Sequence, residues 1–520
     1  MAKCIMIQGT MSGAGKSLLV TALCRIFRED GFRVAPFKSQ NMALNSYITK
    51  DGLEMGRAQA AQAEAAGKEP DVRMNPILLK PTSDVGSQVI VNGRVYGTLK
   101  ARDYFQMKRT LIPDILSAYE SLAEENDIIV IEGAGNPAEI NLKADDIVNM
   151  GLAKLVDAPV VLVGDIDPGG VFAQLYGTIA LLENDEKKRI VGTVINKFRG
   201  DVDILRPGLK MLEELTNVPC LGVVPYAEVD LDDEDSLSTR LETDRHGKVI
   251  DIAVIRLPRI SNFTDFSPLE EHPALGVRYV KKSRDLGDPD MIVLPGTKST
   301  MADLRWLRES GLEALIIRKA RKGTPILGVC GGYQMLGLKL TDPNGVEGDA
   351  EGAFMNGMGL LPTATTFVEN KKRTRVHGHI TAGPWSGAEL EGYEIHMGET
   401  EPVCPDAGMA ADPSGSGLRR TGLSGCDPSE IGQPLVTLAG GVQDGWQLGN
   451  VFGTYLHGLF DTGEFTTSVA DYLMNLRGID PMNFQAEDRD EYRERQYGKL
   501  AAVVRGSLDM EELYRIIKEF

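Results

Sequence analysis

The sequence predicts an α/β protein with two domains, each a mostly parallel sheet flanked by helices. Three observations favour this fold class. The chain has 520 residues, more than one hydrophobic core usually organises, so domains of about 200 to 250 residues each are expected. Short apolar runs alternate with amphipathic stretches, as in βαβ units. Several of these runs end in glycine-rich or polar turns, which is where parallel sheets place functional groups.

The first half of the chain contains the clearest strands. Apolar runs predict strands at 3–8, 128–132, 160–165 and 190–196, with helical patterns between them. A shorter strand at 33–37 and a helix at 18–28 are also expected. This order of elements indicates a parallel sheet.

An acidic run separates the two halves of the chain. Glu228-Val-Asp-Leu-Asp-Asp-Glu-Asp235 interrupts the alternation, so we expect a linker at 229–248. Strands are predicted again at 249–257, 291–295 and 325–329. The expected organisation is a first domain at 1–228, a second domain at 249–463, and a C-terminal helical tail at 464–520.

Composition and charge exclude some functions. The formal net charge is −18 and no basic stripe offsets it, so we expect no nucleic-acid partner. No signal peptide or membrane span is recognisable, which predicts a cytoplasmic protein without a membrane partner. The six cysteines are scattered without a Cys-x-x-Cys pair, a pattern typical of reduced thiols. The sequence is also compatible with a homo-oligomer.

A glycine-rich loop follows the first predicted strand. Gly9-Thr-Met-Ser-Gly-Ala-Gly-Lys-Ser17 precedes the helix at 18–28, where backbone amides at a helix N-terminus favour phosphate. Its spacing is one residue longer than the common P-loop pattern, so a chance glycine-rich loop is the alternative. In the predicted nucleotide site, Lys16 reaches the β- and γ-phosphates and Ser17 binds Mg²⁺. The predicted nucleotide-binding residues are Gly13, Gly15, Lys16 and Ser17.

Polar residues also end several predicted strands. Glu132 ends the strand at 128–132, at the sheet edge where ligands bind in open α/β folds, and with Ser17 it is a candidate Mg²⁺ ligand. Lys38, Asp165 and Asn196 have the same placement and are candidate phosphate or substrate contacts. The alternatives for these residues are solvated charges and ordinary loop polarity.

The second half contains a candidate nucleophile. In Gly328-Val-Cys-Gly-Gly-Tyr-Gln-Met-Leu-Gly337, a buried-strand pattern breaks at Cys330 and continues as a helix. A cysteine at a helix N-terminus is favoured as its thiolate, and the flanking glycines allow a sharp turn. This arrangement is the cysteine counterpart of the serine nucleophile elbow. The alternative is a buried structural thiol.

A nucleophilic thiol needs a base and donors for an oxyanion. His457 follows an apolar segment and precedes a glycine, so it is the preferred base, and His396 is its rival. Gly296 and Gly331 are candidate N–H donors for the tetrahedral intermediate. His377 and His379 share one face of a probable strand, where an exposed or packed pair is a better interpretation than a metal site.

These motifs resemble known families. Gly328–Gly337 with Gly453-Thr-Tyr-Leu-His-Gly458 is similar to class I glutamine amidotransferase domains, and Gly9–Ser17 with Glu132-Gly-Ala-Gly135 is similar to the P-loop domain of dethiobiotin synthetases. The fusion of the two resembles the cobyric acid synthase family. Further segments carry that resemblance: Lys38-Ser-Gln-Asn-Met-Ala-Leu-Asn45, Asn196-Lys-Phe-Arg-Gly-Asp201, Pro258-Arg-Ile-Ser-Asn-Phe-Thr-Asp-Phe266 and Gly392-Tyr-Glu-Ile-His-Met-Gly398.

The resemblance implies a two-site mechanism. Cys330 and His457 would release ammonia from glutamine, and the P-loop domain would use ATP and Mg²⁺ to convert a carboxylate into an acyl phosphate that ammonia attacks. The implied acceptor is a corrinoid carboxylic acid, adenosylcobyrinic acid a,c-diamide, amidated at its b, d, e and g side chains. The rival interpretations are a cobyrinic acid a,c-diamide synthase and a non-catalytic P-loop regulatory protein.

The sequence departs from the family patterns at two positions. Many class I amidotransferases have a glutamate two residues after the catalytic histidine, but Leu459 stands there. The sequence therefore predicts a Cys330–His457 pair without naming a third member of a triad. Pro168 stands where the family usually has an arginine, so any contact made by that arginine is missing.

Overall fold

Contacts between elements divide the chain into two units, one formed by Met1–Glu234 with Asp490–Phe520 and the other by Asp235–Arg489. The computed structural model describes residues 2–83, 86–231, 248–347, 352–404, 431–484 and 486–520. Of the predicted linker, residues 232–247 lie outside this part of the chain. The predicted α/β fold class, with mostly parallel central sheets flanked by helices, is confirmed.

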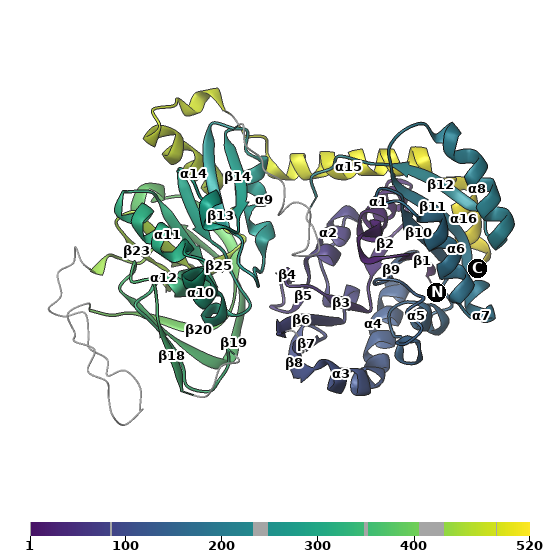
Figure 1. The fold of residues 1–520 in the computed structure, drawn as a ribbon, viewed down its shortest axis with the longest axis horizontal. Coiled ribbons are helices and arrows are strands. Elements are labelled where there is room, and N and C mark those ends of the chain that lie inside the picture. Colours follow the sequence, from purple (N-terminus) through teal and green to yellow (C-terminus); the bar gives the residue numbers. More distant parts are fainter. Residues whose placement is uncertain (1, 84–85, 232–247, 348–351, 405–430, 485) are drawn as a thin grey trace. The chain divides into compact units, whose positions relative to one another are not determined.

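A six-stranded parallel sheet, in the order β12-β11-β10-β1-β9-β2, forms the centre of the first unit (Figure 1). Every residue of β9 and β10 is buried, which explains why continuous apolar runs identified them. The strands are β1 (Lys3–Gly9), β2 (Val34–Phe37), β9 (Ile128–Glu132), β10 (Val160–Asp165), β11 (Ile190–Phe198) and β12 (Cys220–Pro225).

Two small sheets in the first unit were not predicted. Their strands have three to seven residues and contain many polar side chains, so they lack a clear apolar run. One sheet consists of β3 (Gln40–Met42), β6 (Ile77–Ser83), β7 (Gly86–Val91) and β8 (Arg94–Lys100), and the other of β4 (Ser46–Ile48) and β5 (Glu54–Gly56).

Helices accompany the strands of the first unit, as the alternating pattern predicted. They are α1 (Lys16–Glu29), α2 (Arg57–Ala65), α3 (Ala101–Met107), α4 (Ile112–Glu125), α5 (Met150–Leu155), α6 (Val171–Leu181), α7 (Asn184–Lys187), α8 (Val202–Thr216), α15 (Arg489–Ser507) and α16 (Met510–Glu519).

The end of the chain belongs to the core of the first unit. Leu500 and Val504 of α15 and Leu513 and Ile516 of α16 share one hydrophobic cluster with Leu19 of α1 and neighbouring residues. The sequence predicted one helical tail at 464–520. In the structure, the part of this segment before Asp490 belongs to the second unit, and the part from Asp490 onward belongs to the first. Helical periodicity shows that these helices are amphipathic and does not show which core they cover.

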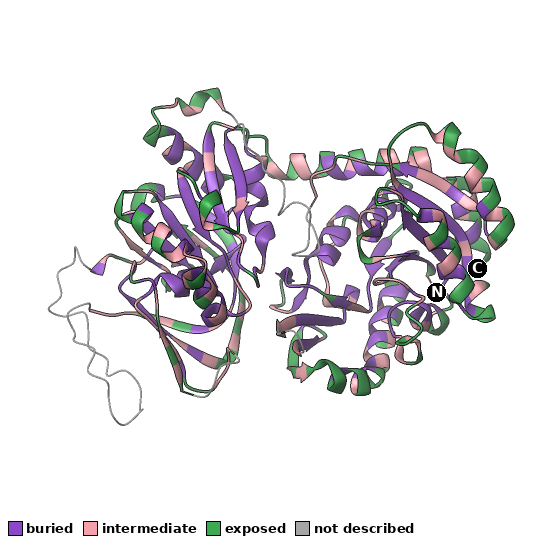
Figure 2. Ribbon diagram, viewed as in Figure 1, coloured by how far each residue is buried: buried purple, intermediate pink, exposed green. Residues whose placement is uncertain are grey.

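The second unit contains a central sheet in the order β14-β13-β15-β16-β24-β23, parallel except for its edge strand β23. Figure 2 shows that the central strands of both units are buried. The strands of this sheet are β13 (Ile250–Ile255), β14 (Leu275–Val280), β15 (Met291–Leu294), β16 (Ile326–Val329), β23 (Trp446–Leu448) and β24 (Val451–Thr454).

A second sheet in this unit is dominated by a long antiparallel pair, β19 and β20, which the sequence pattern did not predict. It contains β17 (Lys339–Asp342), β18 (Ala353–Asn356), β19 (Thr363–Ile380), β20 (Glu389–Pro402), β21 (Val436–Leu438), β22 (Gln443–Asp444) and β25 (Leu456–His457). The helices of the unit are α9 (Ser267–Glu271), α10 (Thr300–Glu309), α11 (Leu312–Arg321), α12 (Gly331–Leu336) and α14 (Gly463–Leu476).

Two further expectations concern membranes and thiols. Within the described ranges, none of the helices combines the length and the apolar character needed to cross a bilayer. Cys4, Cys24, Cys220 and Cys330 are unbridged, but Cys404 is disulfide-bonded, so the expectation of reduced thiols is wrong for Cys404. Scattered spacing excludes a dense disulfide framework and does not exclude a single bridge.

The packing of α16 leads to a stability prediction. Leu513 is 2% exposed, so Leu513→Ala should lower the free energy of unfolding of the first unit by about 3 kcal/mol. Differential scanning calorimetry measures this change. Leu473→Ala, at a fully buried position in the second unit, is the matched control. The two variants should lower different transitions, and a shift of the same transition by both would contradict the assignment of α16 to the first unit.

Candidate functional site

The glycine-rich loop connects β1 to α1, as the sequence predicted. Gly15, the residue before α1, has φ +86°, in the left-handed region that favours glycine. A Cβ atom on Gly15 would lie 2.2 Å from Nδ2 of Asn196, so a side chain at this position would displace the end of β11. Position 15 therefore requires glycine for both conformation and space, whereas a Cβ atom on Gly13 would meet nothing within 4 Å.

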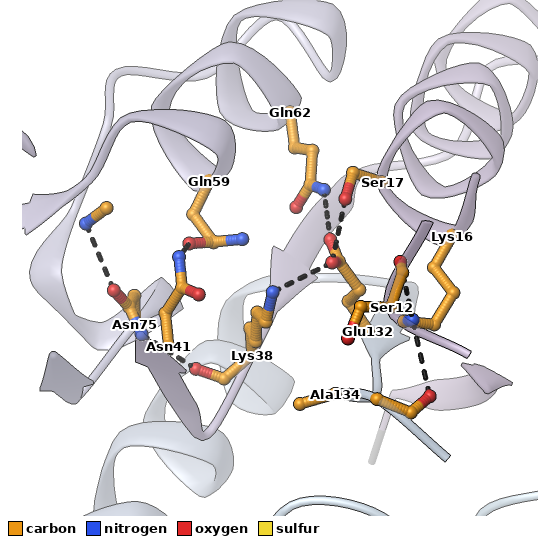
Figure 3. Close-up of polar contacts among 12 residues, drawn as sticks. Ser12, Lys16, Ser17, Lys38, Asn41, Gln59, Gln62, Asn75, Glu132 and Ala134 are labelled. Atoms are coloured by element: carbon orange, nitrogen blue, oxygen red, sulfur yellow. Dashed lines mark hydrogen bonds and ion pairs between the residues drawn. The ribbon is translucent and has the colours of Figure 1, made fainter. Parts of the chain in front are cut away.

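Lys16 connects this loop to the segment after β9. Its side chain is buried, and its Nζ donates a hydrogen bond to the carbonyl oxygen of Met11 at 3.0 Å. It also donates to the carbonyl oxygens of Ser12 at 3.3 Å and Gly135 at 3.4 Å (Figure 3). The lysine ammonium is thus held among backbone oxygens at the start of α1. This is the position from which a P-loop lysine reaches phosphate.

Glu132 lies at the centre of a polar cluster. It is fully buried, and its Oε1 accepts hydrogen bonds from Oγ of Ser17 and Nζ of Lys38, both at 2.9 Å. Its Oε2 accepts a hydrogen bond from Nε2 of Gln62 at 2.5 Å. Figure 3 shows these side chains converging on the carboxylate. Lys38, also buried, balances the charge of Glu132, as a charge removed from water requires.

Strands β10 and β11 contact the same loop from the other side. Nδ2 of Asn196 donates to the carbonyl oxygen of Ala14 at 2.9 Å. Nζ of Lys197 lies 2.7 Å from both the carbonyl oxygen of Gly13 and Oδ2 of Asp165. The structure therefore brings all the predicted residues of this domain to one site. Sequence reasoning missed Lys197, although it lies inside the quoted Asn196–Asp201 segment.

The oxygen donors present here fit Mg²⁺. Oγ of Ser17 and the carboxylate of Glu132 are hard donors that lie in contact, and Mg²⁺ is typically held by one or two such groups together with phosphate oxygens. Within the described ranges, no group of three or more His, Cys, Asp or Glu side chains is arranged to hold a metal ion. The donor set therefore suits an ion shared with a phosphate ligand.

Cys330 lies at the predicted strand-to-helix turn, between β16 and α12. Its φ of 51° and ψ of −109° place a non-glycine residue in a strained conformation, which costs of order 1–3 kcal/mol. The following turn is tight, because a Cβ atom on Gly332 would lie 2.0 Å from the carbonyl oxygen of Leu294. Strain of this kind is characteristic of a nucleophile elbow.

His457 is the histidine paired with Cys330. Its Nδ1 lies 2.6 Å from Oδ2 of Asp265, whose Oδ1 accepts a hydrogen bond from the N–H of Gly458 at 3.1 Å. Burial alone would lower the pKa of His457, but the charge and hydrogen bond of Asp265, with a contact to Cys330, raise this pKa to about 10. The imidazole is thus held as a cation between a carboxylate and a thiol.

Asp265 is a third member that sequence reasoning did not identify. It is buried and lies 192 residues before His457 in the chain, in the segment Phe263–Phe266. Leu459, at the position where related domains have a glutamate, is buried in the hydrophobic core. The carboxylate is therefore supplied from a different part of the chain. The only indication in the sequence was that Asp265 lies within Pro258–Phe266, one of the segments that carry the family resemblance.

The remaining candidates of this domain are placed as follows. A Cβ atom on Gly296 would lie 2.9 Å from Cε1 of His457, and Gly331 is the first residue of α12, so its N–H has no partner within the helix. His396 stacks on Tyr455 with ring centroids 3.7 Å apart and hydrogen-bonds to Gly398 through Nδ1. His377 and His379 are exposed on β19.

An arginine lies in the same row of the sheet as His457. Strand pairing places Arg375 of β19 opposite Tyr393 of β20, and Tyr393 opposite His457 of β25. Residues paired across strands point to the same face of a sheet. The rings of Tyr393 and His457 stack, with centroids 5.5 Å apart. The cationic side chain of Arg375 therefore lies on the same face of the sheet as His457, with Tyr393 between them.

Comparisons with known proteins identify a domain family for each half of the chain. Residues 5–241 match the CobQ/CobB/MinD/ParA nucleotide binding domain family, and residues 251–465 match the CobB/CobQ-like glutamine amidotransferase domain family. The chain is 56% identical to the cobyric acid synthase of Ruminiclostridium cellulolyticum over 100% of this chain and 98% of the relative. It is 54% identical to that of Lachnoclostridium phytofermentans over 100% of both chains, and 52% identical to that of Streptococcus sanguinis over 99% of both chains.

The Asp265–His457 contact leads to a prediction on catalysis and pH. Asp265→Asn should reduce the rate of glutamine hydrolysis by about 10⁴-fold, as the loss of the carboxylate from a catalytic triad does. It should also lower the pKa of His457, measured by NMR titration. The matched control Asp251→Asn removes a carboxylate that pairs with Arg278 and should leave hydrolysis unchanged.

The same contact makes stability depend on pH. A histidine pKa raised from 6.5 to about 10 stabilises the fold fully below pH 6.5, and this stabilisation disappears as the pH rises through 10. In Asp265→Asn, the free energy of unfolding should fall less between pH 6.5 and about pH 10 than it does in the parent protein. An unchanged decline would contradict the assigned pairing.

Proposed function

Because this chain belongs to the cobyric acid synthase family, we propose that it amidates the b, d, e and g carboxylates of adenosylcobyrinic acid a,c-diamide, using ATP and ammonia from glutamine. It is a glutamine-hydrolysing ligase, as its curated relatives are. One observation carries the proposal: a buried P-loop site and a thiol–imidazole–carboxylate site occur in one chain. Identities of 52% to 56% over nearly the whole chain favour this acceptor over that of the cobyrinic acid a,c-diamide synthases.

The first reaction is glutamine hydrolysis in the second unit. The sulfur of Cys330 attacks the side-chain carboxamide carbon of glutamine, and the N–H groups of Gly296 and Gly331 stabilise the oxyanion. The His457 imidazolium protonates the leaving nitrogen, which departs as ammonia. Water then attacks the thioester, gives its proton to His457 and releases glutamate. Asp265 keeps the His457 ring oriented through both steps and stabilises the imidazolium each time it is protonated.

The second reaction is amide formation in the first unit. A substrate carboxylate oxygen attacks the γ-phosphorus of ATP, giving an acyl phosphate and ADP. Ammonia then attacks the acyl carbon, phosphate leaves and a proton is released. Lys16 neutralises charge on the transferred phosphoryl group. Ser17 and Glu132 would hold Mg²⁺, which supplies further charge neutralisation when it is bound. Lys38, Asp165 and Asn196 position the loop and the substrates around it.

Arg375 provides a site for the charged end of glutamine. Attack by Cys330 fixes the carboxamide end of the substrate, so the α-carboxylate must lie a few bonds away. Arg375 lies in the row of Tyr393 and His457, and a guanidinium binds carboxylates through paired N–H donors. The amidotransferase site thus recognises both ends of its substrate.

The two-site mechanism is tested by separating its ammonia sources. Cys330→Ser should abolish glutamine hydrolysis, because the hydroxyl is a far weaker nucleophile, while ammonium salts still support ATP-dependent amidation. Mass spectrometry of the corrinoid products counts the amides added, and four additions to the a,c-diamide are expected. Lys16→Met is the complementary variant and should lose amidation with either nitrogen source. Loss of ammonium-supported amidation in Cys330→Ser would contradict the mechanism.

The role of Arg375 is tested through glutamine affinity. Arg375→Met should raise the KM for glutamine roughly 10- to 100-fold, the effect of losing a charge-assisted hydrogen bond pair. The KM for ammonium should not change. His379→Ala removes another side chain from the same face, four residues along β19, and serves as the control. A glutamine KM raised equally by both variants would exclude a specific carboxylate contact.

A further inference from the structure

Helix α15 contacts both helices that carry residues of the P-loop site. Nη1 of Arg25, on α1, lies 2.5 Å from Oε2 of Glu494 on α15. One residue earlier on α15, Arg493 forms an ion pair with Glu64 on α2. Helix α1 begins with Lys16 and Ser17, and α2 carries Gln62. Helix α15 is thus connected by ion pairs to α1 and α2, the two helices that supply residues to the P-loop site.

Helix α2 presents two different faces. Gln59 and Gln62, three residues apart, are fully buried and point toward the site, where Gln62 donates to Glu132 and Gln59 accepts from Nδ2 of Asn41 (Figure 3). Glu64 lies on another face of the helix and contacts α15. A rotation or shift of α2 would therefore move Gln62 and Glu64 together.

The contact of Glu64 is a small polar network. Oε2 of Glu64 accepts from Arg493 and also from the hydroxyl of Tyr497 at 3.1 Å, and Arg493 is within 3.4 Å of that hydroxyl. The side chains of Arg493 and Glu64 are only 20% and 24% exposed. A partly buried pair supported by a third group is stronger than an isolated surface ion pair.

Helix α2 is closely packed. Eight of its nine residues are buried, and five of these are alanines, at 58, 60, 61, 63 and 65. Arg57 at its start lies over the ring of Tyr47. Alanine side chains are small and make no polar contacts, so they do not by themselves specify the rotation of the helix about its axis. The hydrogen bonds of Gln59 and Gln62 on one side and the ion pair of Glu64 on the other specify that rotation.

We propose that Arg493 is a positioning residue for the ATP-dependent step, acting through Glu64 and α2 to keep Gln62 on Glu132. The inference rests on the proposed function, in which Glu132 and Ser17 serve the phosphate site. Arg493 contacts no reacting atom. It fixes the helix that supplies the third hydrogen bond to the carboxylate of Glu132.

Charge reversal tests this role. Glu64→Arg and Arg493→Glu should each raise the KM for MgATP roughly tenfold in ammonium-dependent amidation, as the loss of an outer-shell partner of a metal ligand does. The double variant E64R/R493E should recover most of the loss, because it restores an ion pair of opposite polarity. Glutamine hydrolysis, which belongs to the second unit, should be unchanged in all three, and the calorimetric transition of the first unit measures how much of that unit is folded.

A matched control separates positioning from general stability. Arg505→Glu breaks another ion pair of α15, with Asp30 at the end of α1 at 2.9 Å, whose side chains are 37% and 29% exposed. This variant should lower the unfolding temperature without raising the KM for MgATP. The inference would be overturned if Arg505→Glu raised the KM for MgATP as much as the single variants do. It would also be overturned if Glu64→Arg and Arg493→Glu left this KM unchanged, or if the double variant did not lower it again. If the parent enzyme itself shows no ATP-dependent amidation with ammonium, the proposed function fails instead.

Discussion

Both sites of this protein are organised around a carboxylate buried away from water. Glu132 is 0% exposed and Asp265 is 4% exposed, and a carboxylate removed from water to this extent requires hydrogen-bond or charge partners. Each carboxylate is therefore surrounded by donors drawn from distant parts of the chain: Ser17, Lys38 and Gln62 for Glu132, and His457 with the N–H of Gly458 for Asp265. The need to satisfy a buried charge brings the functional residues together.

The two carboxylates have different electrostatic effects on their partners. Glu132 forms a buried ion pair with Lys38, so the pair carries no net charge but still offers carboxylate oxygen atoms beside the P-loop. Asp265 instead acts on a titratable partner and raises the pKa of His457 to about 10, against the lowering caused by burial. A charged imidazole is the form that can donate a proton to a leaving nitrogen. In the proposed mechanism, one type of side chain thus supports phosphoryl transfer in one unit and nucleophilic attack in the other.

The sequence predicted the parts of this arrangement that depend on local pattern. Buried strands such as β9 and β10 were found with their correct bounds, because strands covered on both faces are continuous apolar runs. The glycine-rich loop and the turn at Cys330 carry short-range signals as well. Asp265 was not identified, because no local pattern connects it to a histidine 192 residues away. The pairing of β19 with β20 was missed for a related reason, since a long, half-exposed hairpin has a weaker apolar signal than a buried strand.

The C-terminal helices show why chain order is a poor guide to spatial organisation. They follow the second unit in sequence, yet Val504 and Leu513 are buried with Leu19 in the core that supports the P-loop. Amphipathic periodicity predicts that such a helix has an apolar face, but any exposed apolar surface of matching shape could receive it. The polar contacts remove that ambiguity, because Glu64, Arg25 and Asp30 each oppose a specific charge on α15. Hydrophobic burial therefore stabilises the docked helix, whereas the ion pairs determine its position and, through α2, the surroundings of Glu132.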